Sequence, residues 1–157
     1  MGMSHFNPAA GNFGEVYIAA NATLSANPIT ASNTQDHYIP LPAAEVTAAN
    51  QTEMLYYKGA ALTFGGTASS TAGTVTAQMF KRASGGAFTA VSNTVTIPTG
   101  TGAGAILAFP LLTTATDNHR TFRPNAGDTL VCRIVASSTV ATQPTNVRCA
   151  AKMAVLR

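Results

Sequence analysis

The sequence predicts an all-β protein, an antiparallel β-sandwich or barrel that follows an extended N-terminal arm. Thr, Val, Gly and Asn disfavour helix interiors, and they are spread along the whole chain. From residue 55 onward, short segments of alternating polarity are separated by Gly-rich turns, as in antiparallel sandwiches. With 157 residues, the chain is long enough for one domain with a hydrophobic core.

Residues 1–50 are predicted to form the arm, with one strand inside it. Prolines interrupt this segment, and Asn recurs through it. The strand is expected at 15–24, where Val16, Ile18 and Ala20 share one face. A short helix at 43–54 is neither favoured nor excluded by its composition. Because the arm is expected to supply contacts rather than core, deleting residues 2–45 is expected to leave a folded β domain.

Residues 51–157 are predicted to form the β domain. Alternation is clear in its second segment, where Val75, Ala77 and Met79 share one face and polar residues lie between them. Turn clusters rich in Gly, Ser, Asn and Pro separate the segments. The expected strands are 55–64, 74–82, 87–97, 105–113, 128–136 and 146–156.

The last two strands are interpreted as a hairpin centred between residues 140 and 141. That register places Cys132 opposite Cys149 on the apolar face and Arg133 opposite Arg148 on the outer face. A disulfide is geometrically conceivable. Two buried free thiols are the favoured alternative, because the N-terminus shows no export signal and disulfides are rare in reducing compartments.

The charge is low and unevenly distributed. Only 10% of the residues are charged; residues 1–57 carry −4 and residues 58–157 carry +7. The basic residues are scattered, so nucleic acid is not expected as a partner, and no apolar run is long enough for a membrane helix. The basic residues either keep an apolar surface soluble or receive the acidic arm of a neighbouring copy.

The sequence contains no catalytic or metal-binding pattern. The chain has three histidines, which are too far apart in sequence for a local metal-ligand spacing, and its six acidic residues form no close pair. The Gly-rich segment 100–104 lacks the Lys-Ser/Thr of a phosphate loop. Asp117, His119 and Arg120 form a mixed polar cluster, which is interpreted as a loop. The sequence therefore predicts neither an enzyme nor a bound metal or cofactor.

Two stretches of the β domain carry a resemblance to a known family. They read GTVTAQMFKRASGGAFTAVSNTVTIP at 73–98 and FRPNAGDTLVCRIVASSTVATQPTNVRCAAKMAVLR at 122–157. Together they resemble the jelly-roll decoration, or cement, proteins of tailed-bacteriophage capsids, over roughly residues 50–157. The resemblance implies a jelly-roll β domain that is made in the host cytoplasm and ends on the outer surface of the virion. It also implies dimers or trimers that bridge neighbouring copies of the major capsid protein.

The expected functional residues are therefore surface contacts. Aromatic anchors are favoured at protein interfaces, and an outward-facing arginine pair would favour a partner that supplies an anion. Two alternatives stay open: a receptor- or carbohydrate-binding jelly roll of a phage fibre, and another small head or capsid protein. The predicted contacts with the capsid or with other copies are Phe6, Phe13, Tyr17, Tyr38, Arg133 and Arg148.

Overall fold

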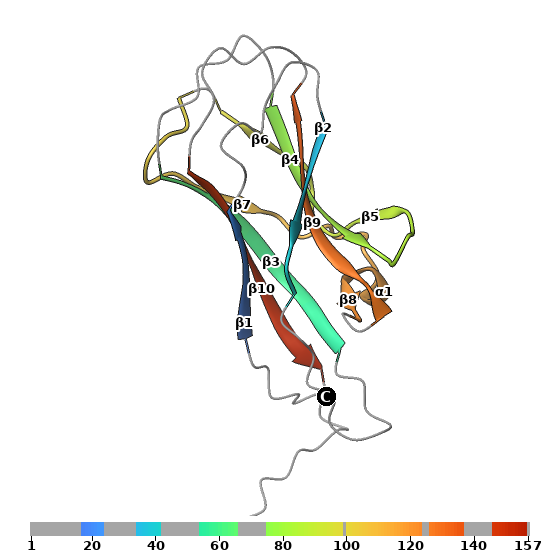
Figure 1. The fold of residues 1–157 in the computed structure, drawn as a ribbon. Helices are drawn as coiled ribbons and strands as arrows, with labels where there is room; N and C mark the ends of the chain where they lie inside the picture. The colour runs from blue at the N-terminus through green and yellow to red at the C-terminus, as the bar shows by residue number, and fades with distance from the viewer. Residues whose placement is uncertain are drawn as a thin grey trace, which may run out of the picture.

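Two antiparallel β-sheets face each other in the computed structural model, which describes residues 17–23, 34–41, 54–65, 75–98, 100–123, 126–136 and 146–156 (Figure 1). We call them sheet A and sheet B. Sheet A has the order β1 (Tyr17–Thr23), β10 (Val147–Leu156), β3 (Met54–Phe64) and β7 (Ile106–Phe109), and β8 (Thr121–Phe122) also pairs with β3. Sheet B has the order β2 (Thr34–Ile39), β9 (Thr129–Ala136), β4 (Val75–Arg82) and β5 (Phe88–Ala90), and β6 (Val95–Ile97) also pairs with β4.

The strand order is that of a jelly roll. Early strands pair with late ones: β1 with β10, β2 with β9, β3 with β7, and β4 with β5. Pairing of β10 with β3 and of β9 with β4 then completes the two sheets. This is one long hairpin rolled into a double-sheet sandwich. The fold class predicted from the sequence is confirmed as an all-β sandwich.

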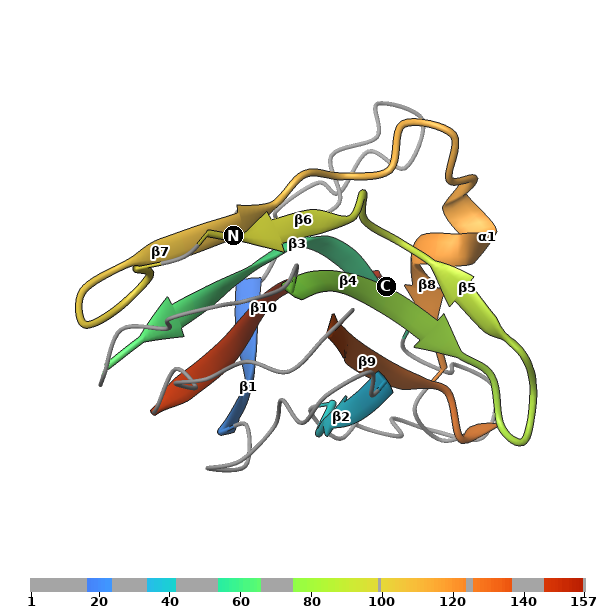
Figure 2. The same ribbon diagram turned by 90° about the horizontal axis from the view of Figure 1, so that it is seen from above.

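The core lies between the two sheets, which appear as separate layers when the molecule is seen from above (Figure 2). Alternation places it there: Val75, Ala77 and Met79 of β4 are buried, while the residues between them are partly exposed. Tyr57 of β3 and Phe122 of β8 are fully buried at 0% exposure. Burial of a side chain such as that of Phe122 contributes about 1.5–3 kcal/mol.

The predicted hairpin between the last two strands is wrong. β9 belongs to sheet B and β10 to sheet A, so the residues between them connect the two sheets instead of closing a hairpin. Cys132 and Cys149 therefore come from opposite sheets, and both are buried free thiols. Cys132 pairs with Met79 across sheet B, and the Met79 Sδ lies 3.7 Å from the Cys149 Sγ. The prediction of buried free thiols thus agrees with the structure, although the register behind it does not.

The first fifty residues contribute more strands than expected. β1 confirms the strand predicted at 15–24, but β2 was not predicted, and it pairs along its whole length with β9. Ile39 at the end of β2 is 1% exposed in the core, and Leu41 packs against it. The described parts of residues 1–50 therefore belong mainly to the sandwich. The sequence had predicted an extended arm that contained a single strand. The helix considered at 43–54 falls almost wholly outside the described residues.

Two smaller differences concern the middle of the chain. The strand expected at 87–97 is split into β5 and β6, both paired with β4. Between them, residues 91–94 lie opposite only residues 78 and 79 of β4, so the regular ladder is interrupted, although Val91 N–H still bonds to Met79 C=O at 3.0 Å. The segment after β7 contains α1 (Asp117–Arg120), a single helical turn, and then β8. The remaining predicted strands lie within a few residues of β3, β4, β7, β9 and β10.

Candidate functional site

The outer face of sheet B carries a layer of aromatic and arginine side chains. Tyr38 on β2, Phe80 and Arg82 on β4, Phe88 on β5 and Arg133 on β9 form this layer, which we call the aromatic–arginine face. The register explains how they meet. Arg82 is directly paired with Phe88, and Val131 of β9 pairs with Tyr38 on one side and with Phe80 on the other. Strands position each of these side chains on a rigid surface.

The two guanidinium groups lie over aromatic rings. The Arg133 Cζ lies 4.1 Å from the centroid of the Phe88 ring and 5.1 Å from that of Phe80. The Arg82 Cζ lies 5.2 Å from the Phe88 ring and 5.7 Å from the Tyr38 ring, and Arg82 also donates a hydrogen bond to the Tyr38 hydroxyl. The Phe80 and Phe88 rings meet edge to face at 6.0 Å. Each cation–π contact at such a partly exposed site contributes about 0.5–1 kcal/mol, so the layer holds its own geometry.

Asp36 on β2 fixes one of these arginines. Arg133 Nε donates to Asp36 Oδ1 at 2.6 Å, and Arg133 Nη2 donates to Asp36 Oδ2 at 2.9 Å. The hydrogen bond from Arg133 lowers the pKa of Asp36, and the same bond raises the pKa of Arg133. Asp36, an acidic residue of the first fifty, therefore pairs with Arg133 of the same chain. The sequence had also allowed the acidic residues of this segment to contact the basic residues of a neighbouring copy.

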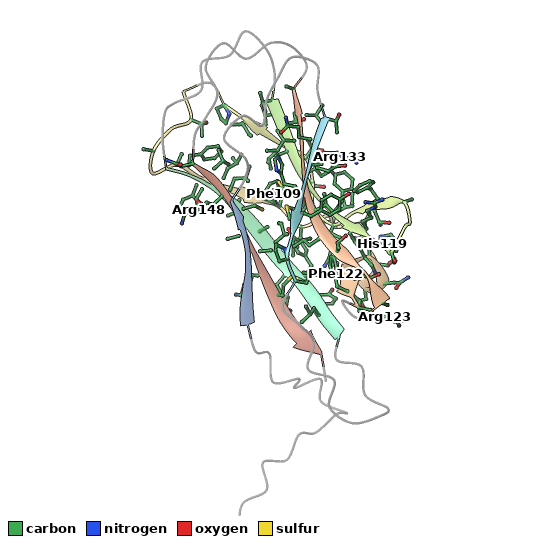
Figure 3. The ribbon with its side chains drawn as sticks, in the orientation of Figure 1. Phe109, His119, Phe122, Arg123, Arg133 and Arg148 are labelled. Carbon is green, nitrogen blue, oxygen red and sulfur yellow. The ribbon has the colours of Figure 1, made fainter. Side chains whose placement is uncertain are left out.

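The structure brings two of the predicted contact residues together and separates a third. Tyr38 and Arg133 lie on the same face of sheet B, and Tyr38 is 47% exposed. Arg148 is exposed on β10 of sheet A, paired with Thr63, so the predicted opposition of Arg133 and Arg148 is wrong (Figure 3). Tyr17 is the first residue of β1, and its side chain lies outside the described residues. Phe6 and Phe13 lie entirely outside them.

Sequence reasoning missed Phe80, Arg82 and Phe88. A signal was present: Phe80 follows the alternation of β4 onto the face otherwise occupied by Thr76 and Gln78. A large aromatic side chain at an outward-facing position indicates a covered or functional surface. Its neighbours on the face come from three other strands, so only the sheet order shows the cluster.

A second surface is notable for the absence of charge. Residues 83–116, a run of 34, include no Asp, Glu, Lys, Arg or His. This run, which we call the uncharged flank, contains β5, β6 and β7, which follow one another along one side of the sandwich (Figure 2). A bridge between Ser92 and Leu111, and a hydrogen bond from Asn93 N–H to Pro110 C=O at 2.8 Å, link its two halves. Ile106 is 73% exposed on it and Leu111 is 37% exposed.

The mixed polar cluster at Asp117, His119 and Arg120 is a structural turn. Asp117 accepts a hydrogen bond from the Tyr56 hydroxyl at 3.0 Å, and Arg120 donates to a backbone carbonyl of the loop before α1. The His119 backbone N–H bonds to Thr116 C=O. Lys81 on β4 donates to two more carbonyls of this segment and forms an ion pair with Asp128 at 3.3 Å. These contacts fasten α1 and β8 to the end of the sandwich.

In the portion of the chain that the structure describes, no three His, Cys, Asp or Glu side chains lie close enough together to hold a metal ion. Within the same portion, no helix has the length and apolar character needed to cross a membrane. Comparison of the chain with models of protein families, with curated proteins and with solved structures found no match.

Proposed function

We propose that this chain is a structural virion protein that binds the outer surface of a tailed-phage capsid, bridges neighbouring major capsid proteins and performs no catalysis. The sequence pattern resembles that of such proteins, and double-sheet jelly rolls recur in viral shells and in lectins. A fold hosts many functions, so the proposal depends on the surface rather than on the fold. The observation that carries it is the aromatic–arginine face.

This face has the composition and rigidity of a protein interface. Aromatic residues and Arg are enriched at interfaces and supply most of the residues whose truncation costs binding. Arg133 is held by Asp36 and by two rings, so little side-chain freedom remains to be lost when a partner covers it. Tyr38 offers an exposed ring and a hydroxyl at the edge of the layer. Individual contacts of this kind can be weak, because copies arrayed on a shell bind several neighbours at once.

A glycan-binding fibre module remains the second candidate, because Tyr38 is a half-exposed aromatic ring next to a carboxylate on β2. Stacked aromatics and carboxylates are the groups that hold sugars. Both oxygens of Asp36, however, already accept hydrogen bonds from Arg133. The face therefore favours a protein partner over a sugar. A different small head or capsid protein would use the same surface.

The direct test is co-sedimentation of the full chain with empty expanded capsids of the major capsid protein from the same phage. We expect the wild-type protein to pellet with the shells, and Tyr38→Ala and Arg82→Ala to weaken binding by at least about tenfold. Arg148→Ala is the matched control, because it removes an exposed arginine from the other sheet. Circular dichroism confirms that each variant is folded.

Three outcomes would contradict the proposal. Failure of the wild-type protein to bind shells would exclude the capsid as its partner. Loss of binding in Arg148→Ala alone would assign the contact to sheet A. Specific binding to an array of glycans, with no binding to shells, would favour the fibre module.

A further inference from the structure

β7 ends sheet A with one of its two sides unpaired by any strand that the structure describes. Its register with β3 pairs Leu62 with Leu107 and Ala60 with Phe109. Phe64 N–H donates to Ala105 C=O at 3.1 Å, which sets the phase of the antiparallel ladder. Because hydrogen-bonded pairs alternate along such a ladder, residues 107 and 109 direct their N–H and C=O groups toward β3. Ala105 does so with its C=O alone, since its N–H bonds to Gly102 C=O at 3.0 Å. The N–H and C=O groups of Ile106 and Ala108 point away from β3, toward the open side.

The side chains of this strand also leave that edge unprotected. Natural edge strands usually carry a charge or a proline that prevents pairing with another chain. Residues 106–109 carry neither, and they lie within the uncharged flank. Ile106 is 73% exposed and Ala108 is also exposed, whereas Phe109 is buried in the core. A large aliphatic side chain is thus presented to solvent beside backbone groups that pair with no strand the structure describes.

We infer that two copies of this chain pair through β7, antiparallel about a two-fold axis at Leu107, and join their A sheets into one continuous sheet. The outward-pointing groups fix the register. Ile106 of one copy lies opposite Ala108 of the other and exchanges two backbone hydrogen bonds with it. The two-fold axis repeats this pair on the other side of Leu107. Leu107 lies opposite Leu107 of the second copy as the non-hydrogen-bonded pair. The exposed Ile106 side chain then packs over Ala108 of the second copy.

A second copy fits this edge better than another occupant does. An antiparallel strand edge is complementary to itself, as a two-fold interface requires. Self-association also brings like charges together, and the chain has a net charge of +3. The uncharged flank is the surface on which this repulsion is smallest. Leu111, 37% exposed and just beyond β7, adds apolar area beside the paired strands. The pairing does not depend on the proposed function, since it needs no shell.

The test is the mass of the full-length protein in solution, measured by sedimentation equilibrium over a series of concentrations. We expect a monomer–dimer equilibrium. Ala108→Pro removes an N–H that points away from β3, so it leaves the pairing within one copy intact while blocking the second copy. Ile106→Lys places a charge on each side of the two-fold axis. Both variants are expected to weaken dimerisation at least about tenfold. Thr94→Lys, exposed in the same uncharged segment but outside β7, is the matched control and is expected to leave the dimer unchanged.

Hydrogen exchange gives a second readout that needs no variant. The amides of residues 106 and 108 are expected to exchange quickly in dilute protein and more slowly as the concentration rises, while those of 107 and 109 stay protected throughout. This readout decides the question if Ala108→Pro fails to fold. A wild-type monomer at every concentration, a trimer, or a dimer that both β7 variants retain would overturn the inference.

Discussion

Asp36 and Arg133, 97 residues apart in the chain, join edge strand β2 to β9 through two parallel hydrogen bonds of 2.6 and 2.9 Å. On the outer face of β2, Tyr38 also contacts Arg82, and Ile39 is the only residue of β2 in the described core. The pair also orients the guanidinium that lies over Phe80 and Phe88. The same contact therefore secures an edge strand and sets the geometry of the aromatic–arginine face.

Replacing either partner is expected to destabilise the protein. Asp36→Asn and Arg133→Met should each lower the free energy of unfolding by about 1 kcal/mol, because the pair is partly exposed and solvent screens it. The double variant should cost less than the sum of the two, and urea denaturation measures this coupling. Because the pKa of folded Asp36 lies below its ordinary value of 3.8, this stabilisation is present above about pH 4 and is lost as the pH falls through the folded pKa. Additive effects of the two substitutions would show that the pair contributes nothing.

His37, the next residue along β2, is expected to make stability depend on pH in a higher range. Its Nε2 is buried and has no hydrogen-bond partner among the described residues, and burial lowers the pKa of the ring from its ordinary value of 6.5. The unfolded chain therefore binds a proton before the folded chain does. Stability should be full above about pH 6.5 and decline as the pH falls below it.

His37→Leu is the variant that tests this. It should raise the free energy of unfolding at pH 7 by about 0.5–1 kcal/mol, because an unpartnered buried nitrogen is removed. The decline in stability between pH 7 and 5 should become smaller, as followed by thermal denaturation in a series of buffers. An unchanged slope would show that another group titrates there.

The stability of the protein is expected to respond differently to the loss of the hydroxyl group from two neighbouring tyrosines. Tyr57 is fully buried, and its hydroxyl has no partner in the described part of the chain. Burial raises the pKa of the phenol well above the ordinary value. Tyr57→Phe should therefore leave stability unchanged or raise it by up to about 1 kcal/mol. Tyr56 donates to Asp117 at 3.0 Å, so Tyr56→Phe should lower stability by about 0.5–1 kcal/mol. A loss in Tyr57→Phe as large as that in Tyr56→Phe would mean that the Tyr57 hydroxyl is satisfied.

The two core thiols are expected to be unreactive in the folded protein. The Cys149 thiol and burial both raise the pKa of Cys132, and thiolates rather than thiols attack disulfide reagents. Labelling with an aromatic disulfide such as DTNB should proceed at the rate of unfolding, and in urea it should reach two thiols per chain. Fast labelling in native buffer, with no change in far-ultraviolet circular dichroism, would contradict the buried placement.

Removal of the N-terminal segment is now expected to damage the fold. The sequence interpretation treated residues 2–45 as dispensable for folding, but this range includes β1 and β2, which pair with β10 and β9. Deleting it uncovers one edge of each sheet and removes Ile39 from the core. We expect a protein that aggregates or loses its cooperative thermal transition, measured by calorimetry. A truncated chain as stable as the full one would restore the earlier interpretation.

Periodicity located strands whose buried positions are apolar, as in β4, β9 and β10, because alternation of Val, Ile, Ala, Met and Cys with polar residues is unambiguous there. It missed β2, whose alternate positions on the core side carry Gln35 and His37 before Ile39. It also paired β10 with β9, because a turn-rich connection has the same composition whether it closes a hairpin or crosses from one sheet to the other. The aromatic–arginine face depends on the pairing of β9 with β2 and β4, so only Tyr38 and Arg133 of its residues were predicted.

The position of β10 has a consequence for how the protein is made. β10 is the last of the described strands along the chain, yet it lies inside sheet A between β1 and β3, so Tyr17 finds its partner only at Ala154. During translation, β1 and β3 leave the ribosome long before the strand that joins them. Sheet A cannot be completed until β10 has emerged, and such long-range pairing is slow. Until β10 has emerged, nascent chains leave apolar strand surface open to chaperones and to one another.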